Sequence, residues 1–113
     1  MNSPVARVLV SDPDPQWRIA LTAIVEALGH EVVHDLSRGS VHAAVVEPLS
    51  REAVALARGA HPAPVVCVTS GRRVIGGWLL EPVAYLEKPV PVGPFVRTLV
   101  RALEGERRAV AAA

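Results

Sequence analysis

Residues 5–12 read VARVLVSD, a valine-rich apolar run that ends at Asp12. Three further apolar runs end at a polar residue in the same way, at residues 41–47, 65–69 and 83–88. Continuous β-branched runs without polar alternation are typical of strands buried on both faces of a parallel sheet. Ligands of such sheets collect beyond the carboxyl ends of the strands. We therefore expect four polar residues to share one edge of the sheet. They are Asp12, Glu47, Thr69 and Lys88.

The composition is that of one small domain. The chain has 113 residues, 50% of them hydrophobic, which is enough to bury a core without disulfides or metal. Its one cysteine, Cys67, lies in an apolar run and is expected to be an inert thiol in a reducing compartment. The net charge is +1 and basic residues are scattered, so we expect no direct binding to nucleic acid. No stretch has the length of a membrane span and no signal sequence is recognisable, so a cytoplasmic protein without membrane contact is predicted.

Segments with helical periodicity separate the runs. Asp14 followed by Pro15 predicts the start of a first helix, and Gly29 predicts its end. The apolar face of this helix consists of Trp17, Leu21, Ile24, Val25 and Leu28. Residues 31–34 predict a short second strand, whereas residues 37–40 are too few and too polar for more than a turn or a vestigial helix.

Three more helices are predicted, over residues 50–58, over residues 72–80 and from about Val92. Residues 106–113 no longer follow an apolar face and are expected to fray, which leaves residues 1–105 as the folded domain. Strands and helices thus alternate along the chain. This order predicts an α/β fold: a doubly wound, five-stranded parallel sheet with helices on both faces and a reduced second helix.

Three segments resemble the receiver domain of bacterial two-component response regulators. They are residues 8–15 (VLVSDPDP), 64–70 (PVVCVTS) and 84–89 (AYLEKP). A threonine that ends one strand and Tyr-x-x-Lys-Pro at the end of the next make the combination specific, and the resemblance spans nearly the whole chain. It implies the flavodoxin-like fold of CheY-like receivers, with strand order 2-1-3-4-5.

The resemblance also implies roles at the strand ends. In receivers a histidine kinase supplies a phosphoryl group to an aspartate after the third strand, beside a Mg²⁺ ion, and the transfer depends mostly on positioning and charge neutralisation. Asp12 matches one member of the acidic pair that binds Mg²⁺, while Thr69 and Lys88 match the residues that contact the phosphoryl oxygens. Tyr85 matches the switch aromatic, and Pro89 matches a proline whose preceding bond is commonly cis.

Two substitutions depart from the family pattern. Glu47 occupies the phosphoacceptor position, and its extra methylene moves the carboxylate by about a bond length, which spoils in-line transfer. Pro13 replaces the second acid, so Mg²⁺ binding should be weak or absent, and no other cofactor is expected. Asp14 could replace that acid, but its context favours a helix cap. We therefore predict a pseudo-receiver, not an enzyme, that acts in signal transduction by phosphorylation-independent protein contact.

Glu47 has two interpretations. Its charge beside Lys88 could imitate part of the phosphorylated state and hold Thr69 and Tyr85 in an active-like arrangement, although a phosphoryl group brings about −2 charge and more acceptor oxygens than glutamate. Alternatively, Glu47 forms a plain ion pair with Lys88 in a site without metal. A further hypothesis is a receiver that still responds to phosphate or a small ligand at the strand-end pocket.

The expected partner surface is the face that receivers form from the fourth helix, fifth strand and fifth helix. Its candidate residues are Arg72, Arg73, Trp78, Arg97 and Arg101. Arginine and tryptophan are enriched in binding hot spots. We expect a regulatory protein partner, with a histidine kinase, a transcription factor or a second copy of the chain as the candidate classes. The alternative is that the arginines are solvated and that Trp78 belongs to the core.

Residues 30–34, HEVVH, match the zinc-protease pattern H-E-x-x-H, which is a hypothesis from another class. On a helix, His30 and His34 would face one zinc ion, with Glu31 as the base. Gly29 is a helix stop, and the two valines favour a strand, where the histidines lie too far apart for one metal. A small zinc metalloprotease is therefore the weaker hypothesis.

Overall fold

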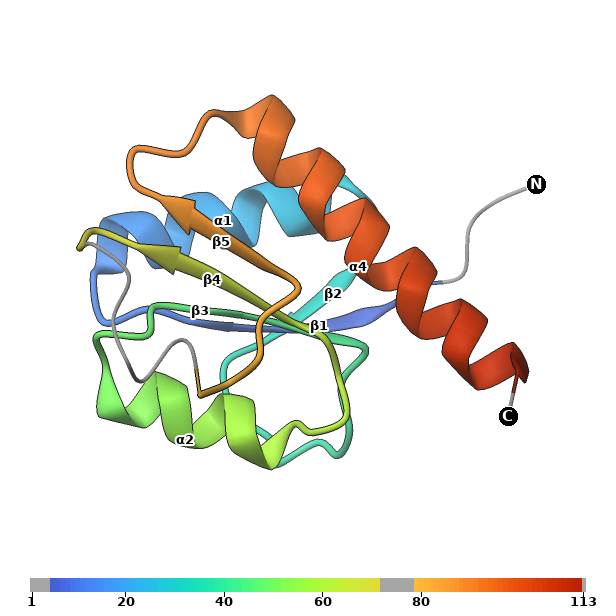
Figure 1. Ribbon diagram of the computed structural model, residues 1–113. Helices are drawn as coiled ribbons and strands as arrows, with labels where there is room; N and C mark the ends of the chain where they lie inside the picture. The colour runs from blue at the N-terminus through green and yellow to red at the C-terminus, as the bar shows by residue number, and fades with distance from the viewer. Residues whose placement is uncertain (1–4, 72–78, 113) are drawn as a thin grey trace.

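The computed structural model describes residues 5–71 and 79–112, with side chains as far as residue 105. Within these ranges five strands and three helices form one compact unit (Figure 1). The strands are β1 (Arg7–Ser11), β2 (Glu31–Val33), β3 (Ala43–Val46), β4 (Val65–Thr69) and β5 (Ala84–Glu87). The helices are α1 (Pro15–Ala27), α2 (Arg51–Gly59) and α4 (Val92–Ala112). In the described part of the chain, no helix is long and apolar enough to cross a membrane.

The strands form a single parallel sheet in the order β2-β1-β3-β4-β5. Ser11 pairs with Val46 across β1 and β3, and Thr69 pairs with Glu87 across β4 and β5. Since each of these residues ends its strand, the residues that follow come together at the carboxyl edge of the sheet. The predicted α/β fold, its five parallel strands and the receiver strand order are confirmed.

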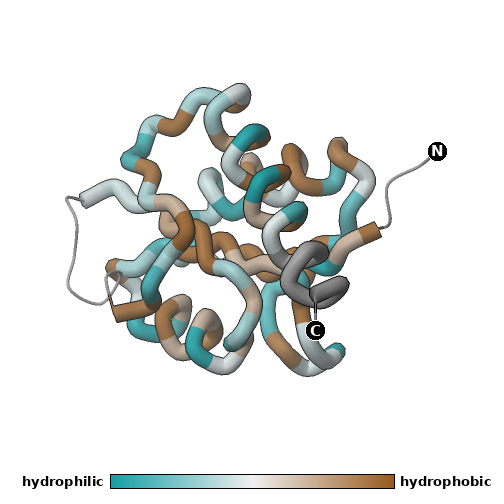
Figure 2. The backbone as a smooth tube through the Cα atoms, turned by 45° about the vertical axis from the view of Figure 1, so that its right-hand side comes forward, coloured by the Kyte–Doolittle hydropathy of each residue, from teal (hydrophilic) through white to brown (hydrophobic). Residues whose placement is uncertain are grey.

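Alternate residues of the central strands pack on opposite faces of the sheet. On one face, Val8 and Val10 pack with Leu21 of α1 and Phe95 of α4. On the other face, Leu9 belongs to the cluster that contains the buried alanines of α2. Figure 1 shows the same division, with α1 and α4 on one side of the sheet and α2 on the other, and Figure 2 shows the apolar strands running through the centre. Helices thus cover both faces, as predicted.

Helix capping residues begin α1 and α2 where the sequence predicts. The carboxylate of Asp14 accepts a hydrogen bond from the Gln16 amide at 2.9 Å, and the hydroxyl of Ser50 accepts one from the Ala53 amide at 3.2 Å. These bonds satisfy amides that have no partner inside the helix. Gly29 follows α1 with φ +89°, a left-handed conformation that glycine adopts without steric cost.

A loop without a helix connects β2 to β3 and is held by charged side chains. Arg7 donates to the carbonyl of Arg38 at 2.6 Å and also contacts the carboxylate of Glu31, which pairs with Arg38 at 2.9 Å. Leu36 packs so closely on the end of α2 that a Cβ at Gly59 would lie 2.9 Å from its Cδ1. The predicted reduction of the second helix is therefore confirmed. The loop supplies packing contacts in place of that helix.

The last helix continues beyond the predicted domain boundary at residue 105. The backbone of α4 is helical through Ala112, so the tail expected to fray is the final part of one helix, and fraying in solution stays a prediction. The helix predicted over residues 72–80 falls largely on residues 72–78, which lie outside the described residues. Arg72, Arg73 and Trp78 belong to that segment.

Candidate functional site

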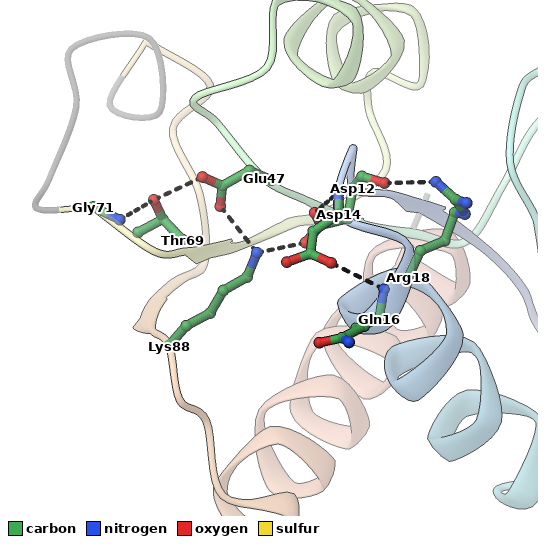
Figure 3. A network of polar contacts seen from close by, with 8 residues as sticks. All are labelled: Asp12, Asp14, Gln16, Arg18, Glu47, Thr69, Gly71 and Lys88. Carbon is green, nitrogen blue, oxygen red and sulfur yellow. Dashed lines mark hydrogen bonds and ion pairs between the residues drawn. The ribbon is translucent and has the colours of Figure 1, made fainter.

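Four strand-end residues converge at the carboxyl edge of the sheet, as the sequence predicts (Figure 3). The Lys88 ammonium lies 2.7 Å from Oδ2 of Asp12 and 3.7 Å from Oε2 of Glu47. The hydroxyl of Thr69 donates to Oε1 of Glu47 at 3.1 Å. The four side chains therefore form one connected polar network.

The network is almost completely buried. Asp12 is 5% exposed, Glu47 3% and Thr69 0%, and the Lys88 side chain is 6% exposed. Charged groups are buried at such levels only when they are paired, because an isolated charge in a protein interior loses its hydration. One ammonium serves two carboxylates here, so the three charged groups sum to a net negative charge when all are ionised.

The two carboxylates are not equally satisfied. Both oxygens of Asp12 have donors, because Oδ1 accepts from the Asp14 amide at 2.9 Å while Oδ2 meets Lys88. Oε2 of Glu47 is buried without a hydrogen-bond partner and has only the more distant contact with Lys88. Lys88 is therefore the counterion of Asp12 first and of Glu47 second, whereas both sequence interpretations of Glu47 considered Lys88 as the partner of Glu47 alone.

Burial raises the pKa of the Glu47 carboxyl above its ordinary value. The charge of Lys88 and the hydrogen bond from Thr69 oppose this increase, and the nearby charge of Asp12 adds to it. Burial also raises the pKa of the Cys67 thiol to about 11, with a smaller contribution from Glu47. Cys67 is thus held as a neutral thiol at physiological pH, in line with the inert core residue expected.

Trp17 is a member of the site that sequence reasoning assigned only to the core. The Lys88 ammonium lies 5.2 Å from the centre of the Trp17 ring, within the range of a cation–π contact. Trp17 is half-buried and also packs against the core shared by α1 and α4. Its place in the first turn of α1, which begins at Pro15 shortly after Asp12, is the signal that could have revealed this role.

Thr69 links Glu47 to the loop that follows β4. Its hydroxyl oxygen accepts a hydrogen bond from the Gly71 amide at 3.1 Å while its hydrogen goes to Glu47. The position of the loop at Gly71 is therefore coupled to the Glu47 carboxylate through one hydroxyl.

Two further residues singled out in the sequence lie on or next to β5. Tyr85 is half-buried, pairs in register with Cys67 and packs in the core on the α2 side of the sheet. Pro89 follows a cis peptide bond to Lys88.

The donor set does not fit a Mg²⁺ ion of the kind that receivers bind. Pro13 contributes no carboxylate, and both oxygens of Asp12 are engaged by the protein. The carboxylate of Asp14 accepts from Gln16 as a helix cap. The Lys88 ammonium brings one positive charge to the two carboxylates, whereas a dication would bring two. In the described residues, no group of three acidic, histidine or cysteine side chains is arranged to hold a metal.

The H-E-x-x-H segment lies in extended backbone. Glu31 begins β2, and His30 and His34 flank the strand. Nδ1 of His30 accepts from the Ala6 amide at 3.0 Å, whereas Nδ1 of His34 bonds the carbonyl of Val10, also at 3.0 Å. The two rings thus contact opposite ends of β1, and the helical geometry that a zinc protease requires is not formed.

The described part of the expected partner surface is exposed. Arg97 and Arg101 both lie on the solvent side of α4. Arg101 also lines a shallow groove of about 200 Å³ between α4 and the start of β5, together with Val83 and Thr98.

The strand order, the helices on both faces and the strand-end residues together define a receiver-type fold. No protein-family model matches the sequence, and no curated protein matches it. Solved structures do match. A CheY-like response regulator receiver domain from Methanospirillum hungatei JF-1 aligns with a TM-score of 0.79 at 17% identity, covering 94% of this chain and 99% of that one.

Two other structures show the same likeness. NtrX from Brucella abortus in complex with ATP aligns with a TM-score of 0.80 at 19% identity, covering 96% of this chain but 29% of that one. The BeF3-activated DrrB receiver domain aligns with a TM-score of 0.74 at 16% identity, covering 89% of this chain and 99% of that one. At these identities the likeness establishes the fold that this chain shares with response regulator receiver domains.

Proposed function

We propose that this chain is a pseudo-receiver in bacterial signal transduction, which acts through protein contact without being phosphorylated. The observation that supports this most directly is the engagement of Lys88 by two carboxylates, at 2.7 Å and 3.7 Å. In a receiver the lysine and the threonine meet the incoming phosphoryl oxygens. Here both are already bonded to the protein's own side chains.

Phosphoryl transfer to Glu47 faces three obstacles. Its longer side chain places the carboxylate away from the position of an aspartate, and in-line displacement tolerates little error. One of its oxygens accepts from Thr69. Weak or absent Mg²⁺ binding, which follows from Pro13 and the engaged oxygens of Asp12, removes the charge neutralisation that the transfer requires.

Glu47 holds the fold in one state, in our proposal. Its carboxylate engages both Thr69 and Lys88, the residues that a phosphoryl group contacts in receivers, and so imitates part of the phosphorylated state. The imitation is partial because glutamate has less charge and fewer acceptor oxygens than a phosphoryl group. The hydrogen bond from Gly71 to Thr69 extends this effect to the loop after β4.

The output of such a domain is a docking surface. We assign it to the face of β5 and α4 that carries Arg97 and Arg101, with Arg72, Arg73 and Trp78 as further candidates. Arginine forms paired hydrogen bonds with carboxylates, so this face suits an acidic surface on a regulatory protein. A histidine kinase, a transcription factor and a second copy of this chain are the candidate partner classes.

The test uses beryllofluoride, a phosphoryl mimic, with Mg²⁺. Trp17 lies close to Lys88 and reports on the site by its fluorescence. We expect no change on addition of the two reagents, whereas a receiver with an aspartate acceptor, measured in parallel, changes. A saturable, Mg²⁺-dependent change in this protein would refute the proposal.

A double variant, Pro13→Asp with Glu47→Asp, separates the two causes. Recovery of beryllofluoride binding in the double variant attributes the loss to these side chains. Continued absence of binding attributes it to the surrounding loops.

A further inference from the structure

A crevice of about 310 Å³ opens at the carboxyl edge of the sheet, on the side of β2 and α2. Its lining includes Ser11, Pro13, Arg18, His34, Ser50 and Glu52. β1 lies between β2 and β3, and the helices that follow β1 and β3 lie on opposite faces of the sheet. The crevice is thus at the topological switch point, where open α/β sheets bind ligands. In Figure 3, Arg18 and Lys88 approach Asp12 from opposite sides, so the crevice shares Asp12 with the Lys88 network but is lined by neither Lys88 nor Glu47.

Three polar side chains line the crevice with hydrogen-bonding capacity to spare. Arg18 is half-buried, and one of its guanidinium nitrogens donates to the carbonyl of Asp12 at 3.1 Å, which fixes the side chain and leaves further N–H donors. Nδ1 of His34 donates to the Val10 carbonyl, which leaves Nε2 as a second polar atom. The Ser50 hydroxyl accepts from Ala53 and retains its own hydrogen for donation.

Among the described residues, Arg18 is the one arginine or lysine that lines the crevice, and the carboxylates of Asp12 and Glu52 line it as well. The Asp12 carboxylate is paired with Lys88 and accepts a hydrogen bond from the Asp14 amide, so it is less available to repel an anion than a free carboxylate would be. Pro13 places no charge on the wall at the position where receivers have an acid. Glu52 is exposed, and its negative charge counteracts the positive charge of Arg18.

We propose that this crevice binds a small phosphomonoester, without Mg²⁺ and without covalent transfer. The planar guanidinium of Arg18 matches two phosphate oxygens at once, which an ammonium does not do. The volume lies at the lower end of the range for ligand sites, so the ligand is of the size of a pentose phosphate. Binding in the crevice does not depend on whether Glu47 can be phosphorylated.

Calorimetric titration in the presence of EDTA tests the proposal with ribose 5-phosphate, inorganic phosphate and ribose. We expect saturable binding of ribose 5-phosphate, weaker binding of phosphate and none of ribose. Arg18→Gln should weaken binding by about tenfold or more, the usual size for a charge-assisted hydrogen bond. Glu52→Gln should tighten it, because the variant removes a like charge from the rim. Arg58→Gln, an exposed arginine in the last turn of α2, is the matched control and should leave binding unchanged.

Arg18→Lys keeps the positive charge but loses the two-point contact of the guanidinium with the phosphate. It therefore tests that contact, and it replaces Arg18→Gln in the experiment if that variant does not fold. Its affinity should fall between those of the wild type and Arg18→Gln. Amide chemical shifts locate the ligand and should move at Ser11, His34 and Ser50. Absence of saturable binding, equal losses in the Arg18 and Arg58 variants, or shifts centred on Thr69 and Lys88 would each overturn the proposal.

Discussion

The two ends of the sheet carry two ionic networks that differ in burial. At the amino ends of β1 and β2, Glu31 pairs with Arg7 and Arg38, whose side chains are 29% and 66% exposed. At the carboxyl ends, the side chains of Asp12, Glu47 and Lys88 are between 2% and 6% exposed. Exposed pairs contribute little because water and salt screen them, whereas buried pairs carry a large desolvation cost. The first network holds a loop, while the second is costly to stability and is best explained by function.

Loss of the shared cation should have the largest effect. Lys88→Met leaves two buried carboxylates without a counterion, and breaking a buried pair in this way costs about 3–5 kcal/mol. We expect a loss of that size in the free energy of unfolding, measured with urea. Arg38→Met at the other network is the matched control and should cost less than about 1 kcal/mol. Equal losses in the two variants would remove the distinction between the two ends.

Removal of the Thr69 hydroxyl should have the next largest effect. Thr69→Val leaves an oxygen of Glu47 and the Gly71 amide without their partner, which costs about 1–3 kcal/mol. Hydrogen exchange at the Gly71 amide should become faster. Thr69→Ser keeps the hydroxyl and should preserve protection of that amide. Unchanged exchange in Thr69→Val would contradict the proposed coupling between Glu47 and the loop.

The ionisation of Glu47 should reduce stability at neutral pH. Because burial raises its pKa above the ordinary value of 4.5, the folded protein binds this proton more tightly than the unfolded chain does. Its contribution to stability is therefore fully present below pH 4.5 and is lost as pH rises through the folded-state pKa. Glu47→Gln cannot ionise, so its stability relative to the wild type should increase from pH 4.5 to neutral pH. A difference that stays constant or decreases over this range would show that Glu47 is not disfavoured as an anion.

Salt should affect the amino-end network and leave the carboxyl-end network largely unchanged. The pair between Arg38 and Glu31 is exposed, so its contribution of about 0–1 kcal/mol should disappear at high ionic strength. Arg38→Gln should therefore differ from the wild type at low salt and match it at high salt in urea unfolding. The cost of Lys88→Met, by contrast, should persist at high salt.

The fold followed from the sequence because the central strands are buried on both faces. Strands buried on both faces have no alternation of polar and apolar residues, so they are visible in the sequence as continuous valine-rich runs. The ends of the strands were predicted less accurately, because hydrogen-bond pairing and not hydropathy decides where a strand begins and ends. Val5 and Val83 belong to the apolar runs, yet they are 68% and 59% exposed and precede β1 and β5.

The membership of the site was predictable, but its internal pairing was not. Parallel strands of similar register place Asp12, Glu47 and Lys88 together whatever their side chains do. Which carboxylate is nearer to the ammonium depends on side-chain length and on donors such as the Asp14 amide, which no pattern in the sequence records. The contact of Trp17 with Lys88 was not predicted, because a half-buried aromatic residue on a helix has the same periodicity as a core residue. The crevice beside Arg18 has no motif, since its walls come from four separate segments.

The most direct test of the central claim is exposure of the protein to Mg²⁺ and a small-molecule phosphodonor, followed by intact mass spectrometry. A receiver with an aspartate acceptor, treated in parallel, should gain a phosphoryl group. The pseudo-receiver proposal predicts that this protein retains its unmodified mass throughout. Stoichiometric phosphorylation that is lost in Glu47→Gln would contradict it.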